Sequence, residues 1–146
     1  MIGASRIVVC ADVLEGDHVS KPTIAMFGFI VEDMARSLAF YRKLGMEFPE
    51  GSDEREGLVI PIGGGLQMFW STVFAAKNDP KWTPPSGGYR MLIEFFVEGH
   101  DAVDALYESL TSDGHPGHKP PCVTDFGAYM AMVDDPDGNT VLITAG

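Results

Sequence analysis

The sequence predicts an α+β fold in which two βαβββ modules form a curved mixed sheet with a cleft, and the helices cover the outer face. One observation is the order of elements, because each half shows a strand, a helix and then further short strands. The other is a weak internal repeat. Among the identities at an offset of 66 residues, five pair Phe29 with Phe95, Val31 with Val97, Glu32 with Glu98, Ala39 with Ala105 and Tyr41 with Tyr107. Since a helix covers only one face of each sheet, the other face is left to line a cleft.

The first module is predicted from an apolar strand, a capped helix and a hairpin. Its elements are, in order, a strand over residues 24–31, a helix that begins after Asp33, and two strands over residues 57–62 and 66–70. Asp33 is a suitable N-cap, and Met34, Leu38 and Tyr41 recur at helical spacing to form one apolar face. The three glycines between the two strands are typical of a hairpin turn.

The second module is predicted to repeat this plan after a long loop over residues 73–88. Its elements are a strand over residues 90–97, a helix with an apolar face of Val103, Leu106, Tyr107 and Leu110, and two strands over residues 128–133 and 140–144. The segment DDPDGN lies between the last two strands and predicts a tight turn.

The length and composition indicate a single packed domain. The chain has 146 residues, 45% of them hydrophobic. We expect an N-terminal extension over residues 1–22 and one domain over residues 23–146. No apolar run is long enough to span a bilayer, so we expect no membrane partner and a cytoplasmic protein. Cys10 and Cys122 lie far apart and form no disulfide framework, although a single bridge between them stays an alternative.

The formal net charge of −11 argues against a nucleic-acid partner, because a phosphate backbone needs a basic surface. Such a charge attracts cationic ligands over long distances. The alternative is that the acidic residues serve only solubility, and they are not concentrated in any one segment.

Two segments in this order resemble the vicinal oxygen chelate superfamily. They are the helix motif VEDMARSLAFYRKLGMEF and the closing turn and strand DDPDGNTVLI, and the resemblance covers residues 23–145. That superfamily includes glyoxalase I, extradiol dioxygenases, fosfomycin-resistance enzymes and bleomycin-resistance proteins. The resemblance implies the two-module fold, pairing of modules within a chain or between chains, and a small-molecule site in the cleft.

The resemblance also implies where a metal would be held. Members that bind a divalent metal take one ligand from each of four strands, usually His, Gln or Glu. In this sequence the resemblance places the four positions at Met26, Met68, Leu92 and Leu142. Thioether and aliphatic side chains do not bind the hard or borderline divalent ions, which take imidazole or carboxylate ligands. We therefore expect no bound metal and no cofactor.

Strand alternation, started from these positions, predicts the residues that line the cleft. The predicted ligand-binding residues are Met26, Met68, Trp70, Leu92, Glu94, Phe96 and Leu142. Trp70 would stack on a planar ring or a cation, or else would simply pack in the core. Glu94 is a carboxylate in an otherwise apolar strand, and this pattern has two interpretations. Glu94 faces a ligand, as an anchor for a cation or as a general base, or it forms an ion pair with Arg90.

Two functions follow from these expectations. The first is a metal-free homodimer that sequesters a small, partly aromatic and in some cases cationic organic molecule, as the bleomycin-resistance resemblance implies. The alternative is a metal-independent isomerase, lyase or cyclase that uses Glu94 as its general base, and no catalytic residue is assigned beyond that. A structural module whose cleft is filled by its own side chains is a third option.

Overall fold

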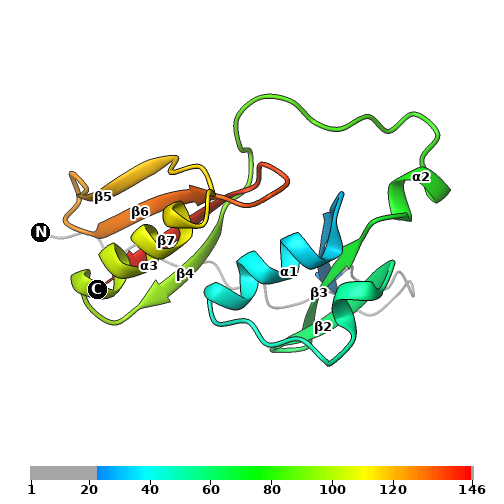
Figure 1. The fold of residues 1–146 in the computed structure, drawn as a ribbon, viewed down its shortest axis with the longest axis horizontal. Coiled ribbons are helices and arrows are strands. Elements are labelled where there is room, and N and C mark those ends of the chain that lie inside the picture. Colours follow the sequence, from blue (N-terminus) through cyan, green and yellow to red (C-terminus); the bar gives the residue numbers. More distant parts are fainter. Residues whose placement is uncertain (1–22, 146) are drawn as a thin grey trace, which may run out of the picture.

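The computed structural model describes residues 23–145, so the predicted extension over residues 1–22 lies outside it. Two modules stand side by side, and a long loop arches between them from α2 to β4 (Figure 1). The first module contains β1 (Met26–Ile30), α1 (Met34–Lys43), the 3-10 helix η1 (Ser52–Glu54), β2 (Gly57–Gly63), β3 (Leu66–Ser71) and α2 (Phe74–Asn78). The second contains β4 (Ile93–Val97), α3 (His100–Ser112), β5 (Lys119–Val123), β6 (Tyr129–Asp134) and β7 (Thr140–Ala145).

The strands form two separate mixed sheets. The first sheet has the order β1-β3-β2 and the second has the order β4-β7-β6-β5. In each sheet the first strand of the module runs parallel to the last, and the remaining pairs are antiparallel. The predicted α+β class and the repeat of modules are confirmed. The second module has the βαβββ order, but its strand β5 lies in a segment for which no strand is predicted, and the first module has only two strands after its helix.

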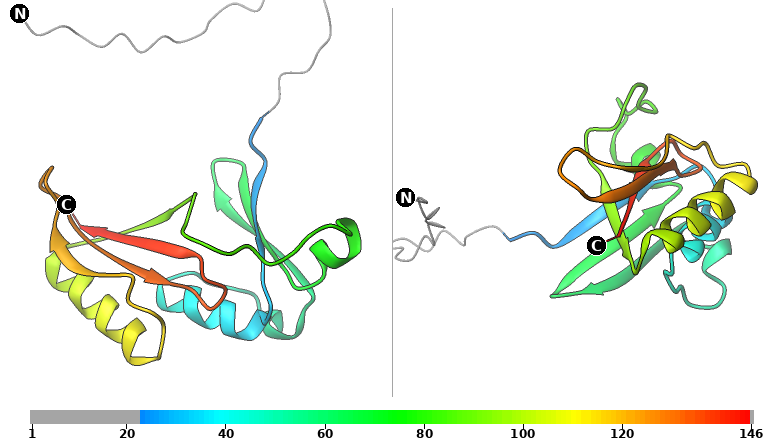
Figure 2. Two further views of the ribbon diagram at one scale, coloured as in Figure 1. Left: turned by 90° about the horizontal axis from the view of Figure 1, so that it is seen from above. Right: turned by 90° about the vertical axis from the view of Figure 1, so that its left-hand side faces the viewer.

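The helices α1 and α3 lie on the same side of the molecule, with the sheets on the other (Figure 2). Each sheet therefore has a helix face and a face turned away from the helices, which we call the open face. None of the helices between residues 23 and 145 is long and apolar enough to cross a membrane.

Helix α1 forms where the sequence predicts it. The side chain of Asp33 accepts a hydrogen bond from the backbone N–H of Arg36 at 2.9 Å, which satisfies one of the free donors of the first turn. Arg42 and Lys43 lie in the last turn, where positive charge is favoured by the helix dipole. The face between these ends buries Leu38, Phe40 and Tyr41 completely.

The core of the first module is aromatic. Trp70 of β3 is fully buried, stacks on Phe29 with ring centroids 5.0 Å apart, and meets the edges of Tyr41 and Phe48. The rings come from two neighbouring strands, α1 and the loop after α1. Buried aromatic pairs of this kind contribute about 0.5–1.5 kcal/mol each beyond the area they bury. This cluster therefore fixes α1 against the first sheet.

Three contacts join the first module to the second. The hydroxyl of Tyr41 donates to Asp135, which lies between β6 and β7. The Phe40 ring meets the edge of the His115 imidazole, and the ammonium of Lys43 pairs with Asp113. All three start from α1, and the backbone N–H of Glu32, just before this helix, adds a hydrogen bond to Asp137 of the second module.

Candidate functional site

The open face of the second sheet carries four of the side chains considered for the cleft. Ile93, Phe95 and Val97 of β4 pack against the core, so the alternate residues Glu94 and Phe96 point to the open face. Strand β7 follows the same rule, since Val141 and Ile143 are buried in the core and Leu142 and Thr144 alternate with them. Phe96 is 67% exposed. The predicted positions of Glu94, Phe96 and Leu142 on this face agree with the structure.

Glu94 is exposed rather than buried. Its Oε1 accepts a hydrogen bond from the hydroxyl of Thr144 at 2.5 Å, across the β4–β7 pair. No ion pair between Glu94 and Arg90 occurs in the part of the chain that the structure describes. Glu94 is therefore not a desolvated carboxylate, because its side chain is exposed to solvent.

The open face of the first sheet is covered by a phenyl ring. Met26, Gly28 and Ile30 lie on this face of β1, and Phe69 is the partner of Gly28 in β3. A Cβ atom added to Gly28 would lie 2.1 Å from Cε1 of Phe69, so the ring lies directly over the glycine. Any larger residue at position 28 would have to displace the ring.

Met68 and Trp70 do not reach the open face, which corrects the prediction. Trp70 is fully buried and Met68 is 5% exposed, and both belong to the core beneath the helices. Their partners in the parallel pair are Phe27 and Phe29, which also face the core. Gln67 and Phe69 are the β3 residues that face away from the helices. Leu92 precedes β4 and is half-buried.

A pocket of about 590 Å³ lies where β1 ends. Four segments meet there: the end of β1, the helix α2, the long loop that follows it, and the turn between β6 and β7. The end of β1 contributes Gly28, Ile30 and Glu32 to the lining, and α2 contributes Ala75 and Ala76. The long loop contributes Trp82, Pro84 and Pro85, and the β6–β7 turn contributes Pro136, Asp137 and Asn139. This volume is in the range of pockets that bind small organic molecules.

The β6–β7 turn is held rigidly in this wall by Asp135. Asp135 is 2% exposed, and its Oδ1 accepts the backbone N–H groups of Asp137 and Asn139 at 2.9 and 2.8 Å. Its Oδ2 accepts the Asn139 side-chain amide and the Tyr41 hydroxyl, each at 2.8 Å. A buried carboxylate with four donors is well satisfied. The turn is therefore fixed both internally and against α1 of the other module.

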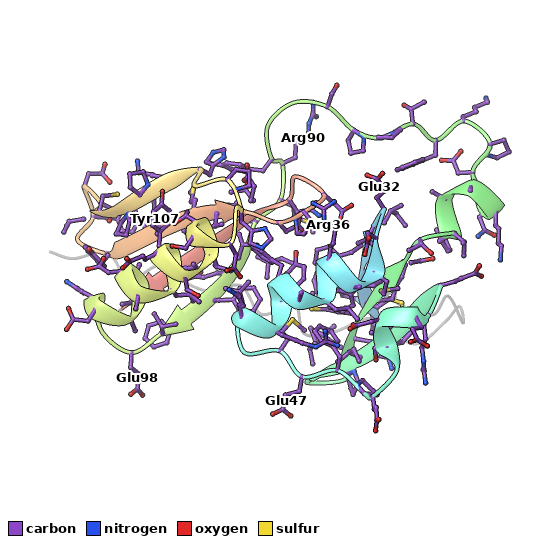
Figure 3. All side chains as sticks on the ribbon, in the orientation of Figure 1. Glu32, Arg36, Glu47, Arg90, Glu98 and Tyr107 are labelled. Carbon is purple, nitrogen blue, oxygen red and sulfur yellow. The ribbon has the colours of Figure 1, made fainter. Side chains whose placement is uncertain are left out.

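Asp137 is one of two carboxylates among the lining residues, and the other is Glu32. Its Oδ1 accepts the backbone N–H of Glu32 at 2.9 Å, and its Oδ2 is buried without a hydrogen-bond partner among the described residues. Burial raises the pKa of Asp137, the charges of Asp135 and Glu32 act in the same direction, and the Glu32 N–H and the charge of Arg36 oppose them. Figure 3 shows Glu32 at the end of β1 and Arg36 on α1 near the β6–β7 turn.

The sequence predicts the turn DDPDGN but not its place in the pocket wall. The segment PKWTPP lies in the predicted long loop and has no predicted function. The available signal was the combination of a tryptophan and two prolines in a long loop, since such loops are often functional.

Comparison with protein families decides which family this fold represents. The model of the Glyoxalase/Bleomycin resistance protein/Dioxygenase superfamily matches residues 23–143. The chain belongs to this superfamily. The predicted resemblance is thereby confirmed over nearly the whole of the described chain. No curated protein matches the sequence significantly.

Solved structures of the glyoxalase superfamily share the fold. A glyoxalase/bleomycin resistance protein/dioxygenase family enzyme from Burkholderia phytofirmans has a TM-score of 0.68 and 21% identity, with 83% of this chain and 96% of that chain covered. A glyoxalase-related enzyme from Fulvimarina pelagi has a TM-score of 0.67 and 20% identity, covering 85% and 88%. A hypothetical protein from S. aureus has a TM-score of 0.67 and 22% identity, covering 90% and 96%. At these identities the likeness shows the fold alone.

The residues of this glyoxalase-superfamily chain do not fit the divalent metal that many members bind. In residues 23–145, no three His, Cys, Asp or Glu side chains lie close enough together to hold a metal ion. With the alternation of β3 corrected, Gln67 rather than Met68 shares the open face with Met26. One amide beside a thioether and a phenyl ring is not a site for a hard or borderline ion. The expectation of a metal-free protein stays a prediction that rests on this donor set.

Proposed function

We propose that this glyoxalase-superfamily protein binds a small, partly aromatic organic molecule without a metal, as a sequestering protein of the bleomycin-resistance type. The observation that carries the proposal is the pocket of about 590 Å³ at the end of β1. Its walls combine an indole, prolines and alanines with a few polar groups, the combination by which proteins bind and orient small molecules.

The pocket walls support binding because they are held in place before a ligand arrives. The β6–β7 turn is fixed by Asp135 and Tyr41, and the prolines of the long loop restrict its backbone. A preorganised site loses less conformational entropy on binding than a mobile one. Retention of an intact compound, rather than its conversion, is the expected behaviour of such a site.

The experiment is native mass spectrometry of freshly purified protein, followed by titration with aromatic compounds under the same conditions. We expect retained or added small molecules at one per chain, with unchanged masses after release. Turnover of the compound would contradict sequestration. About one tightly bound divalent ion per chain would contradict the metal-free prediction.

The alternative function is a metal-independent isomerase, lyase or cyclase. One observation favours it: Glu94 is exposed on the open face and is oriented by the Thr144 hydroxyl, so a substrate proton could reach it. A pH–rate profile that loses its acidic limb, the fall in rate at low pH, in Glu94→Gln would support this alternative, once a substrate is found.

We also propose a cytoplasmic homodimer. The edge strands β1, β2, β4 and β5 each pair on one side only within the described chain, and their free edges need cover. Phe96 of β4 is two-thirds exposed and Met91 before it is 65% exposed, which adds apolar surface beside one of these edges. Light scattering that gives the mass of a monomer at high micromolar concentration would contradict the dimer.

A further inference from the structure

The charges that line the pocket have one sign. Glu32 and Asp137 contribute carboxylates, and no Lys, Arg or His side chain is among the lining residues. The nearest opposing charge that acts on Asp137 is Arg36, which lies on α1 outside the lining. The whole chain carries a formal net charge of −11. The carboxylates of the pocket and the negative net charge of the chain therefore both favour binding of a cation over an anion.

Asp137 has one carboxylate oxygen without a partner. Oδ1 is held by the Glu32 N–H, which fixes the side chain in the wall, while Oδ2 is buried and has no partner among the described residues. An unpaired buried carboxylate oxygen is unfavourable, and a charged N–H donor satisfies it better than a neutral one. Because Asp137 lines the pocket, a ligand there can supply such a donor once the side chain turns toward it.

Another part of the lining, which comes from the long loop, is suited to a flat ring. Trp82 is 40% exposed, and its backbone N–H donates to the carbonyl of Asp79 at 3.1 Å, which holds the start of the loop in a turn. Pro84 and Pro85 continue the same wall. An exposed indole beside rigid prolines packs well against an aromatic ring, and its face also attracts cations.

We propose that the pocket selects monocationic aromatic amines and amidines, with the charged nitrogen donating to the carboxylate of Asp137 and the ring against Trp82 and Pro84. This inference rests on the proposed binding function and adds the charge of the ligand and the residue that anchors it. It also moves the anchor from Glu94, which the sequence suggested, to a turn of the second module.

The test uses calorimetric titration of the full-length protein with two pairs of compounds that match in shape and differ in charge. Benzamidine is compared with benzamide, and tryptamine with tryptophol. The key variant is Asp137→Asn, which removes the charge and keeps an oxygen for the Glu32 N–H. Asp125→Asn is the matched control, because it removes one exposed charge from the β5–β6 turn at the other end of the molecule (Figure 1).

We expect each cation to bind wild type about tenfold or more tightly than its neutral partner, the size of effect that a desolvated charge pair produces. Asp137→Asn should abolish this preference, and Asp125→Asn should retain it. Thermal unfolding of each variant shows that it is folded. If Asp137→Asn does not fold, the preference of wild type for the cations still decides the question of charge.

Different failures are distinguishable. If neither pair binds, or if Trp82→Ala leaves the binding of both pairs unchanged, the proposed function of this pocket is overturned. If the compounds bind and Trp82→Ala weakens them, but cations and neutral partners bind equally, the function survives and the charge inference is overturned. Loss of the cation preference in Glu94→Gln, with Asp137→Asn unaffected, would overturn Asp137 as the anchor.

Discussion

The hydroxyl of Tyr41 lies 2.8 Å from Oδ2 of Asp135, and both side chains are buried, although 94 residues separate them in the sequence. This bond ties the helix of the first module to the last turn of the second. In Tyr41→Phe the bond is lost and Asp135 keeps its other donors, so the free energy of unfolding should fall by about 1–3 kcal/mol. Chemical denaturation measures the change.

Tyr129→Phe is the control for this substitution. Its hydroxyl donates to Asp104 at 2.5 Å, but the bond is exposed, so its removal should have a much smaller effect. Equal effects of the two substitutions would show that the Tyr41–Asp135 bond does not join the modules in the way described.

The same bond predicts a decline of stability at alkaline pH. Burial, followed by the charge of Asp135, raises the pKa of Tyr41 well above its ordinary value of 10.0. The folded state therefore keeps a proton that the unfolded state loses, so this contribution to stability is complete below pH 10 and falls as the pH rises further. Tyr41→Phe should show a shallower decline, by up to about 1.4 kcal/mol per pH unit. Urea denaturation at several pH values around 10 measures the free energy of unfolding of wild type and of Tyr41→Phe. Equal slopes of this free energy against pH for the two proteins would contradict the prediction.

Tryptophan fluorescence checks the correction made for β3. The chain has two tryptophans, Trp70 and Trp82. Because Trp70 is fully buried, Trp82→Phe should leave blue-shifted emission that acrylamide quenches poorly. Trp70→Phe should leave red-shifted emission from Trp82, quenched by acrylamide and changed by pocket ligands. Strong quenching of Trp70 would instead place it on the open face.

Gly28→Ala should destabilise the protein through Phe69. The new methyl group would lie 2.1 Å from the edge of the ring, which must then move. Such overpacking typically costs about 1–3 kcal/mol. In a Phe69→Leu background the same substitution should cost clearly less, which a double-mutant cycle from thermal unfolding measures. Additive effects would contradict the contact.

Glu94→Gln should hardly change stability. Glu94 is exposed, and the amide oxygen of glutamine can still accept the hydrogen bond from Thr144. A surface substitution of this kind is expected to change the free energy of unfolding by no more than about 0.5 kcal/mol. A large loss of melting temperature would indicate a hidden cationic partner of Glu94, as the predicted ion pair required.

The sequence was sufficient to predict most of the fold, because the decisive signals are local. The Asp33 cap, the helical spacing of Leu38 and Tyr41, and the turn residues after Asp134 each act within a few positions. These signals correctly located α1, α3 and the closing hairpin. The repeat then predicted their assembly, since two modules of one design bury the same faces.

The faces of β3 were predicted wrongly because the alternation was started from Met68, a position implied by the family resemblance. Taken by itself, the strand alternates the apolar Leu66, Met68 and Trp70 with a face that carries the polar Gln67, and this pattern favours the first set for the core. The structure confirms that arrangement, since Trp70 meets Phe29 and Phe48 in the core. The pocket was missed for another reason, because its walls come from a loop and a turn that have no periodic pattern.

The turn that closes the pocket has no counterpart in the other half of the chain. The hairpin in the corresponding place of the first module consists of Gly63, Gly64 and Gly65, which carry no side chains. Asp137 and Asn139 therefore have no equivalents in the first module. The two modules share the order of their elements, but the side chains of these two turns differ. A titration curve of this chain should accordingly describe one class of site with a stoichiometry of one, and not two half-sites of similar affinity.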